Sequence, residues 1–173
     1  MILREELEPQ ITIAEELFPK IFDLISLYDS GYDNGDEEKM KTAINQINFL
    51  TNKNINVEDL FEYWEGESQK ELAFRLSLPN PLNVDCITKD ELIEIVRRMQ
   101  SFDDNGISEK LSDLGVPLSS VLSYNYYAEL IKRNFAYPEP SGLLDSQLVN
   151  GKYVEYSTEE IVNIIISCKA IAL

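Results

Sequence analysis

The sequence contains no histidine in its 173 residues. Histidine is the side chain that most often serves as general base, proton shuttle or metal ligand near neutral pH. Its absence excludes a cysteine–histidine nucleophile and the Glu-x-x-His ligand sets of di-iron helical bundles. Catalysis would have to rely on Asp, Glu, Lys or Tyr alone, so we expect a protein that is not an enzyme.

Cysteine and long apolar segments are also scarce. Cys86 and Cys168 are the only cysteines, and their distant positions fit neither a disulfide framework nor a zinc-ligand spacing. The longest apolar stretch, residues 161–173, is interrupted by polar residues and is too short to span a bilayer. The acidic N-terminus lacks the basic start and apolar run of a signal peptide. We therefore expect reduced thiols, no membrane partner and a cytoplasmic location.

Motifs for nucleotide, nucleophile and calcium chemistry are missing. The chain has no Gly-x-Ser-x-Gly sequence, no phosphate loop and no dinucleotide-binding glycine pattern. An EF-hand loop with Gly106 at position six would place Ser112 at position twelve, where calcium requires a bidentate carboxylate. The same alignment on Gly35 places Lys41 there. We expect neither a metal nor a cofactor.

Carboxylate pairs at helical spacing, such as Glu58 with Glu62, could in principle support acid–base chemistry or ligate a metal. Such pairs are common in this acidic chain and are weak indicators by themselves. Glu94 is followed by Arg97 and Arg98 at three and four positions, a spacing typical of ion pairs along a helix. We therefore expect no catalytic residue.

What the chain does have is negative charge. It carries 31 Asp and Glu against 15 Lys and Arg, for a formal net charge of −16. Residues 1–70 hold 16 of the acids and 6 of the bases, so the charge is densest in the N-terminal part. Nucleic acids and anionic membranes are recognised by Lys and Arg clusters, so neither is expected as a direct partner. The charge favours a basic protein partner.

Helix signals dominate the sequence. Capping boxes (Ser or Thr with Glu three positions later) begin at Thr12, Ser68, Thr88 and Ser157. They predict helices over residues 12–30, 68–78 and 88–99 and a C-terminal helix that is apolar on nearly every side. Further helices are expected over 36–50, 108–114 and 117–135, whereas residues 29–35 have a loop composition.

One short β-hairpin is expected near the C-terminus. The apolar segments 147–149 and 153–156 flank Asn150-Gly151, a strong signal for a tight hairpin turn. An isolated hairpin is marginally stable, so we expect it to pack on the helices. The predicted fold is mainly α, a single domain over residues 1–173. It has about six to eight helices, a small C-terminal hairpin and a buried C-terminal helix.

The first candidate partner-binding segment is residues 58–67, which combines three aromatic residues with five acids. Its candidate contact residues are Glu58, Asp59, Glu62, Tyr63, Glu65 and Glu67. If Asn56 caps a helix here, Leu60, Phe61 and Trp64 share one face and the acids lie opposite. Two interpretations remain open: an amphipathic helix with Trp64 in the core, or an acidic face with Tyr63 as an exposed anchor.

The second candidate is the pair Tyr124 and Tyr127, within the helix expected over residues 117–135. One apolar face of this helix consists of Leu118, Val121, Leu122, Tyr126 and Leu130. Tyr124 and Tyr127 lie on a neighbouring face, so the rings either pack in the core or contact a partner. Tyrosine is enriched in the residues that dominate binding energy at protein interfaces.

In its acids and adjacent helical tyrosines, the chain resembles the small, acidic, helix-rich immunity proteins of bacterial toxin systems, such as the colicin nuclease immunity family. The resemblance is one of general character, and the expected hairpin at 147–156 departs from that small fold. It implies an inhibitor that binds a basic toxin or nuclease domain. Two alternatives are a helical structural or adaptor domain with a non-basic partner, and, more remotely, a DNA-mimic protein.

Overall fold

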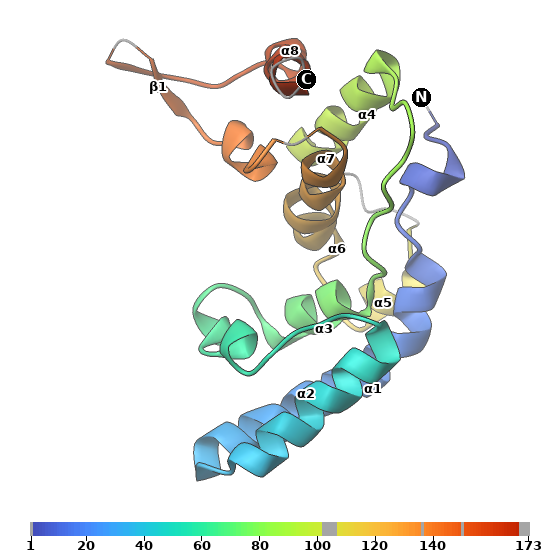
Figure 1. Ribbon diagram of the computed structural model, residues 1–173, viewed down its shortest axis with the longest axis vertical. Coiled ribbons are helices and arrows are strands. Elements are labelled where there is room, and N and C mark those ends of the chain that lie inside the picture. The colour runs from blue at the N-terminus through green and yellow to red at the C-terminus, as the bar shows by residue number, and fades with distance from the viewer. Residues whose placement is uncertain (1, 102–106, 136, 150, 170–173) are drawn as a thin grey trace. The chain divides into compact units, whose positions relative to one another are not determined.

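The computed structural model describes residues 2–101, 107–135, 137–149 and 151–169 (Figure 1). The α-helices are α1 (Ile11–Asn34), α2 (Glu37–Thr51), α3 (Gln69–Ser77), α4 (Lys89–Gln100), α5 (Glu109–Asp113), α6 (Leu118–Val121), α7 (Tyr127–Phe135) and α8 (Thr158–Lys169). Short 3-10 helices are η1 (Glu5–Leu7), η2 (Glu58–Leu60), η3 (Tyr63–Glu65) and η5 (Pro140–Leu144). The strands are β1 (Gln147–Val149) and β2 (Lys152–Val154). The predicted mainly helical fold with a small C-terminal hairpin is confirmed.

The chain folds into two compact units. The N-terminal unit comprises Gln10–Pro79 and Asn105–Leu118. The C-terminal unit comprises Met1–Pro9, Asn80–Asp104 and Ser119–Leu173. Each unit buries its own apolar side chains, among them Ile21, Ile25, Tyr28, Ile47 and Phe74 in the first and Leu92, Ile95, Tyr127, Leu130 and Ile165 in the second. The single domain expected from the length remains a prediction.

In the N-terminal unit, α1 and α2 form an antiparallel helical hairpin (Figure 1). The loop predicted over residues 29–35 is wrong, because α1 continues to Asn34 and ends at Gly35 with a left-handed φ of 65°. Gly31 permits the close approach of the two helices. A Cβ on Gly31 would lie 2.9 Å from the Met40 side chain. Residues 29–34 are rich in loop-forming residues, but packing against α2 favours a helix there.

α1 begins without the predicted capping box. The helix begins at Ile11, and Thr12 lies inside its first turn, where it does not cap the end. Glu15 instead accepts a hydrogen bond from the Ser108 hydroxyl on the segment that leads into α5. The Glu15 carboxylate, which the capping box would use, is therefore engaged in a tertiary contact instead.

The other three capping boxes are confirmed. Ser68 and Thr88 each accept from the backbone N–H three residues on, and the glutamate there accepts from the capping residue's own N–H. Ser157 and Glu160 exchange the same pair of bonds, at 3.4 and 2.8 Å. Each box satisfies two N–H groups that a helix start leaves unpaired.

The predicted helix over residues 117–135 forms as α6 and α7 joined by a π-helical segment, Leu122–Tyr126. In the C-terminal unit, α4 and α7 are linked through Arg98. Its guanidinium donates to Glu94 at 3.1 Å, to Glu8 at 2.7 Å and to Tyr127 at 2.7 Å. The ion pairs predicted for Glu94 are confirmed, although Glu94 itself is buried.

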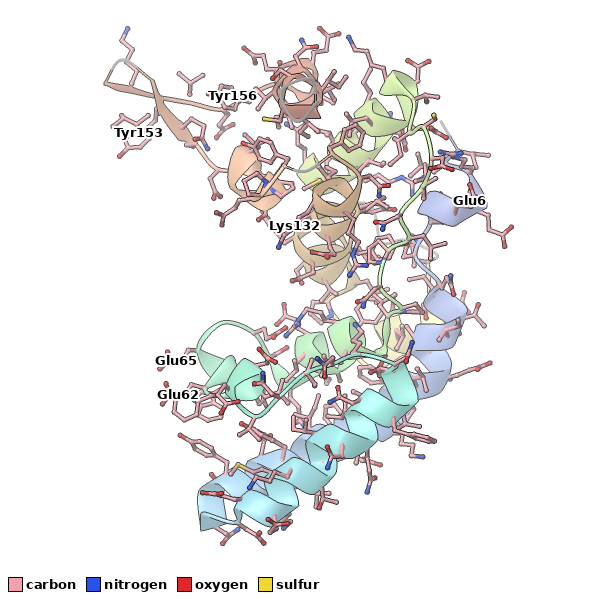
Figure 2. The ribbon with its side chains drawn as sticks, in the orientation of Figure 1. Glu6, Glu62, Glu65, Lys132, Tyr153 and Tyr156 are labelled. Atoms are coloured by element: carbon pink, nitrogen blue, oxygen red, sulfur yellow. The ribbon has the colours of Figure 1, made fainter. Side chains whose placement is uncertain are left out.

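The hairpin pairs Val149 with Lys152 and Leu148 with Tyr153, as the turn signal predicts; Asn150 itself lies outside the described residues. The expectation that it packs on the helices is wrong. Leu148 is 64% exposed and Tyr153 is 79% exposed, and Figure 2 shows Tyr153 on the extended strand pair. In its described part, α8 buries one face, formed by Ile161, Val162 and Ile165, and exposes Ile166. It is not enclosed on every side.

Candidate functional site

Residues 58–67 do not form the continuous helix that the apolar spacing predicts. They form two single 3-10 turns, η2 and η3, separated by Glu62 in a left-handed conformation with φ 53°. Asn56 caps the first turn as predicted: its side chain accepts from the Asp59 N–H at 3.1 Å, and the Asp59 carboxylate accepts from the Asn56 N–H at 2.8 Å. Because of the break at Glu62, the side chains of η3 do not continue the helical register of η2.

The segment is fixed to the helices of its own unit. Leu60 is buried beneath it. Its hydrogen-bonded ties are Tyr28 Oη to the Val57 carbonyl (3.1 Å), Tyr63 Oη to Asp29 Oδ2 (2.8 Å) and Arg75 Nε to Glu67 Oε2 (3.0 Å). Glu67, a predicted partner contact, is therefore engaged in an internal ion pair with α3. Tyr63 is half-buried and anchored rather than free.

Four aromatic rings meet on this surface, and we call them the aromatic cluster: Tyr32, Phe61, Tyr63 and Trp64. The centroid of Tyr32 lies 5.8 Å from that of Phe61 and 5.1 Å from that of Trp64, and Trp64 lies 5.5 Å from Tyr63, all edge to face. Phe61 is 54% exposed and Trp64 is 48% exposed. The interpretation that places Trp64 in the core is therefore wrong, because the break at Glu62 turns it outward.

Acidic residues are concentrated in the two segments that supply the aromatic cluster. The two segments that supply it, residues 29–38 and 58–67, contain ten Asp and Glu and no Lys or Arg. Figure 2 shows Glu62 and Glu65 projecting outward from the second segment. Within the described residues, no salt bridge forms at Glu58, Glu62 or Glu65. We call the cluster together with Asp33, Glu58, Asp59, Glu62 and Glu65 the acidic–aromatic surface.

Burial of the Asp29 carboxylate is electrostatically costly, and its hydrogen bond with Tyr63 offsets part of that cost. Burial raises the pKa of Asp29, the Tyr63 hydrogen bond lowers it in part, and nearby Asp33 raises it further. Burial and the neighbouring Asp29 carboxylate also raise the pKa of Tyr63, so its hydroxyl keeps its proton and remains a donor. The anchor of the aromatic cluster therefore depends on a partly buried carboxylate with a raised pKa.

An open groove of about 660 Å³ lies beside the aromatic cluster, between α1, α2 and the segment that leads into η2. Its apolar lining comes from Tyr28, Tyr32, Met40, Ile44, Ile55, Val57 and Phe61. Glu37, Glu58 and Lys41 supply its charges, and Lys41 pairs with Glu37 at 3.4 Å. The groove is therefore apolar inside, with Glu58 as an uncompensated negative charge at its lining.

The structure separates the two predicted tyrosines. Tyr124 is 53% exposed, whereas Tyr127 has no exposed surface and receives the Arg98 hydrogen bond. Tyr127 is thus a core residue of the C-terminal unit and is not available as a partner contact, which corrects the prediction. Tyr124 and the acidic–aromatic surface belong to different units, so each is treated as a separate surface.

Sequence reasoning missed Tyr32, Asp29 and the groove. All three follow from the extension of α1 through residues 29–34, which the sequence pattern assigns to a loop. A helical register would have placed Tyr28 and Tyr32 one turn apart, on the same face. That i, i+4 tyrosine pair was the available signal.

Three further observations bear on function. Within the described residues, no group of three His, Cys, Asp or Glu is arranged to hold a metal ion. In the same part of the chain, no helix is both long and apolar enough to cross a membrane. Comparisons with protein-family models, with curated proteins and with solved structures found no match.

Proposed function

We propose that this protein is an immunity- or antitoxin-like inhibitor that neutralises a basic toxin or enzyme by binding it through the acidic–aromatic surface. The observation that carries the proposal is the exposure of Phe61 and Trp64 among acids that no base offsets. Large aromatic side chains supply most of the binding energy at many protein interfaces. About half of each of these two side chains is exposed to water, and exposed apolar surface of this kind is typical of protein contact sites.

Charge supports the choice of a basic partner. The N-terminal unit holds 16 of the 31 acids and only 7 of the 15 bases. Complementary potentials accelerate encounter with an oppositely charged protein and disfavour wrong partners. The acids of this surface would therefore raise the association rate, and its aromatic rings would lengthen the lifetime of the complex.

The acidic–aromatic surface is ordered in the free protein. The three ties from Tyr28, Tyr63 and Arg75 hold the segment that carries Phe61 and Trp64. A surface that is ordered before binding loses less conformational entropy in the complex. The arrangement suits tight inhibition better than transient contact. We also propose that the protein has no catalytic activity of its own, since it lacks histidine altogether.

The test is capture of the partner followed by an assay of its activity. The immobilised protein is exposed to lysate of the source cells at low salt, and bound proteins are released by rising salt and identified. We expect a basic protein whose own activity is inhibited at equimolar ratio. A partner that binds but retains its activity, or that is not basic, would contradict inhibition. Release of the partner by duplex DNA would favour the DNA-mimic alternative.

The adaptor alternative is favoured by one specific observation. The hairpin of the C-terminal unit exposes Leu148, Tyr153 and Val154, and Tyr124 of the same unit is also exposed. Exposed apolar side chains of this kind are typical of protein contact sites. An adaptor would bind through these residues and would tolerate loss of Phe61 and Trp64. Replacing each set in turn with serine and repeating the capture separates the two functions.

A further inference from the structure

The groove beside the aromatic cluster has the size and lining of a binding site. Its volume of about 660 Å³ lies in the range of sites that enclose small ligands or several side chains. Tyr28 and Ile44 in its lining are buried, whereas Phe61 is exposed at the junction with the aromatic cluster. Met40 adds a flexible side chain that adapts to the shape of an occupant.

The charges of the groove indicate what it would accept. Lys41 pairs with Glu37 and lies within 3.9 Å of Glu38, so the groove's cation is already neutralised. Glu58 has no such partner within the described residues, and neither do Glu62 and Glu65 on the adjoining surface. An occupant that carries positive charge next to an apolar group is therefore complementary, and an acidic one is repelled.

We propose that this groove binds a basic amphipathic segment of the partner protein. One bulky apolar side chain of that segment would enter the groove, and a flanking Lys or Arg would pair with Glu58. A further cation would lie against the exposed faces of Phe61 and Trp64, where aromatic rings attract positive charge. Insertion of an amphipathic segment into an apolar groove is a recurring mode of peptide recognition. The inference rests on the proposed function and specifies how the partner is recognised.

A direct test uses synthetic peptides of about 20 residues, above the length at which an isolated helix is marginal in water. The probe combines Leu with Lys. Three matched peptides replace Leu with Ser, Lys with Gln, or Lys with Glu. Trp64 is the only tryptophan of the chain and lies in the aromatic cluster, so its fluorescence reports binding at this surface. Anisotropy of labelled peptide provides a readout independent of Trp64.

Two pairs of variants locate the site. Phe61→Ala removes an exposed ring that lines the groove, and Phe49→Ala removes an exposed ring of α2 outside the lining. Asn45→Arg places a cation in the groove, and Gln46→Arg places the same charge at the next exposed position of α2. Circular dichroism and thermal melting verify that all four variants fold.

We expect the Leu–Lys peptide to bind, and Phe61→Ala and Asn45→Arg to weaken it about tenfold or more. Phe49→Ala should change the affinity by less than about twofold, and Gln46→Arg by much less than Asn45→Arg, since only long-range repulsion remains. The Leu–Glu peptide should not bind. No binding of the Leu–Lys peptide up to about 1 mM would overturn the inference.

Other outcomes distinguish failure of the inference from failure of the proposed function. If the Ser–Lys peptide binds as well as the Leu–Lys peptide, the groove is not used, although a basic partner is still recognised. If the Leu–Gln peptide binds as well as or better than the Leu–Lys peptide, the surface does not select a basic partner and both proposals fail. With the captured partner, unchanged affinity of Asn45→Arg overturns the groove alone, because Asn45 lies outside the acidic–aromatic surface. Unchanged affinity of Phe61→Ala as well counts against the proposed function too.

Discussion

At the scale of single residues, Asp29 is the most informative side chain of the acidic–aromatic surface. Its Oδ2 accepts the Tyr63 hydroxyl, whereas its buried Oδ1 has no hydrogen-bond partner within the described residues. A buried, unpaired carboxylate oxygen is unfavourable, and burial raises the pKa of Asp29. The folded protein therefore binds the Asp29 proton more tightly than the unfolded chain does.

The difference between the folded and unfolded pKa of Asp29 determines how the free energy of unfolding changes with pH. Because the folded pKa exceeds the unfolded one, the Asp29 contribution to the free energy of unfolding falls as pH rises through that interval. Asp29→Asn removes the titration and leaves an amide oxygen to accept from Tyr63. We expect the stability of Asp29→Asn relative to wild type to increase between about pH 4 and pH 8, measured by urea unfolding. Parallel pH profiles would contradict it, and Asp23→Asn, at an exposed position of α1, is the control.

The two tyrosines of the π-helical region and α7 allow a second residue-scale prediction. Tyr127→Phe removes an acceptor from the buried Arg98 network and should lower the free energy of unfolding by about 1–2 kcal/mol. Tyr124→Ala removes an exposed ring and should change it by less than about 0.5 kcal/mol. Denaturant unfolding of both variants provides the comparison. Equal losses would mean that Tyr124 is as structural as Tyr127.

At the scale of elements, α1 shows how a proline is tolerated inside a helix. Pro19 has no N–H, so it cannot donate to the carbonyl of Glu15 one turn earlier. Lys110, on α5, donates its ammonium to that carbonyl at 2.9 Å. Ser108 adds a hydrogen bond to the Glu15 side chain. A contact distant in sequence thus replaces the backbone bond that proline removes.

Lys110→Met keeps the aliphatic stem and removes this donor. We expect it to lower the free energy of unfolding by about 0.5–1 kcal/mol, because the Glu15 carbonyl exchanges the ammonium for water. In a Pro19→Ala background the loss should be smaller, since the restored N–H bonds to the same carbonyl. Lys20→Met on the exposed face of α1 is the control. Additive effects of the two changes would exclude the coupling.

Local signals predicted elements well where one segment contained the whole pattern. The capping boxes at Ser68, Thr88 and Ser157 formed because both partners belong to the same turn. The capping box predicted at Thr12 did not form, because Glu15 bonds to Ser108, which is far along the chain. The continuation of α1 past residue 29 and the break at Glu62 depend on packing between segments, which periodicity does not encode.

The candidate site was predictable only where its residues do not depend on packing between segments. The acids at 58, 62 and 65 were identifiable by composition, because charged side chains seldom enter a core without partners. The exposure of Trp64 was not, because it depends on a left-handed residue that is not glycine. Tyr127 was misassigned because the π-helical segment before it and the Arg98 hydrogen bond both favour its burial.

At the scale of the whole molecule, the net charge of −16 makes association with a basic partner sensitive to salt. Glu62→Lys and Glu65→Lys each reduce the local negative field without removing a side-chain hydrogen bond within the described residues; the backbone bond from the Glu65 N–H to the Glu62 carbonyl is kept. We expect both to slow association with the captured partner severalfold and to flatten its dependence on ionic strength. Stopped-flow kinetics at several salt concentrations measure this.

Glu109→Lys on α5 applies the same charge change away from the acidic–aromatic surface and serves as the matched control. It should slow association less than Glu62→Lys does, because screening weakens interactions beyond about 10 Å at 0.1 M salt. Equal effects of the three variants would show that only the total charge matters, and that this surface does not select the partner.

The bond between Lys110 and Glu15 also has a consequence for biosynthesis. These residues are 95 positions apart, so at roughly 10 residues per second the ribosome makes Glu15 on the order of 10 s before Lys110. During that interval the Glu15 carbonyl, to which Pro19 cannot donate, also lacks the hydrogen bond from the Lys110 ammonium. The nascent α1 can therefore form only with the Glu15 carbonyl unbonded to Lys110. A ribosome stalled before codon 110 would therefore carry a more protease-sensitive first helix than one stalled well after it.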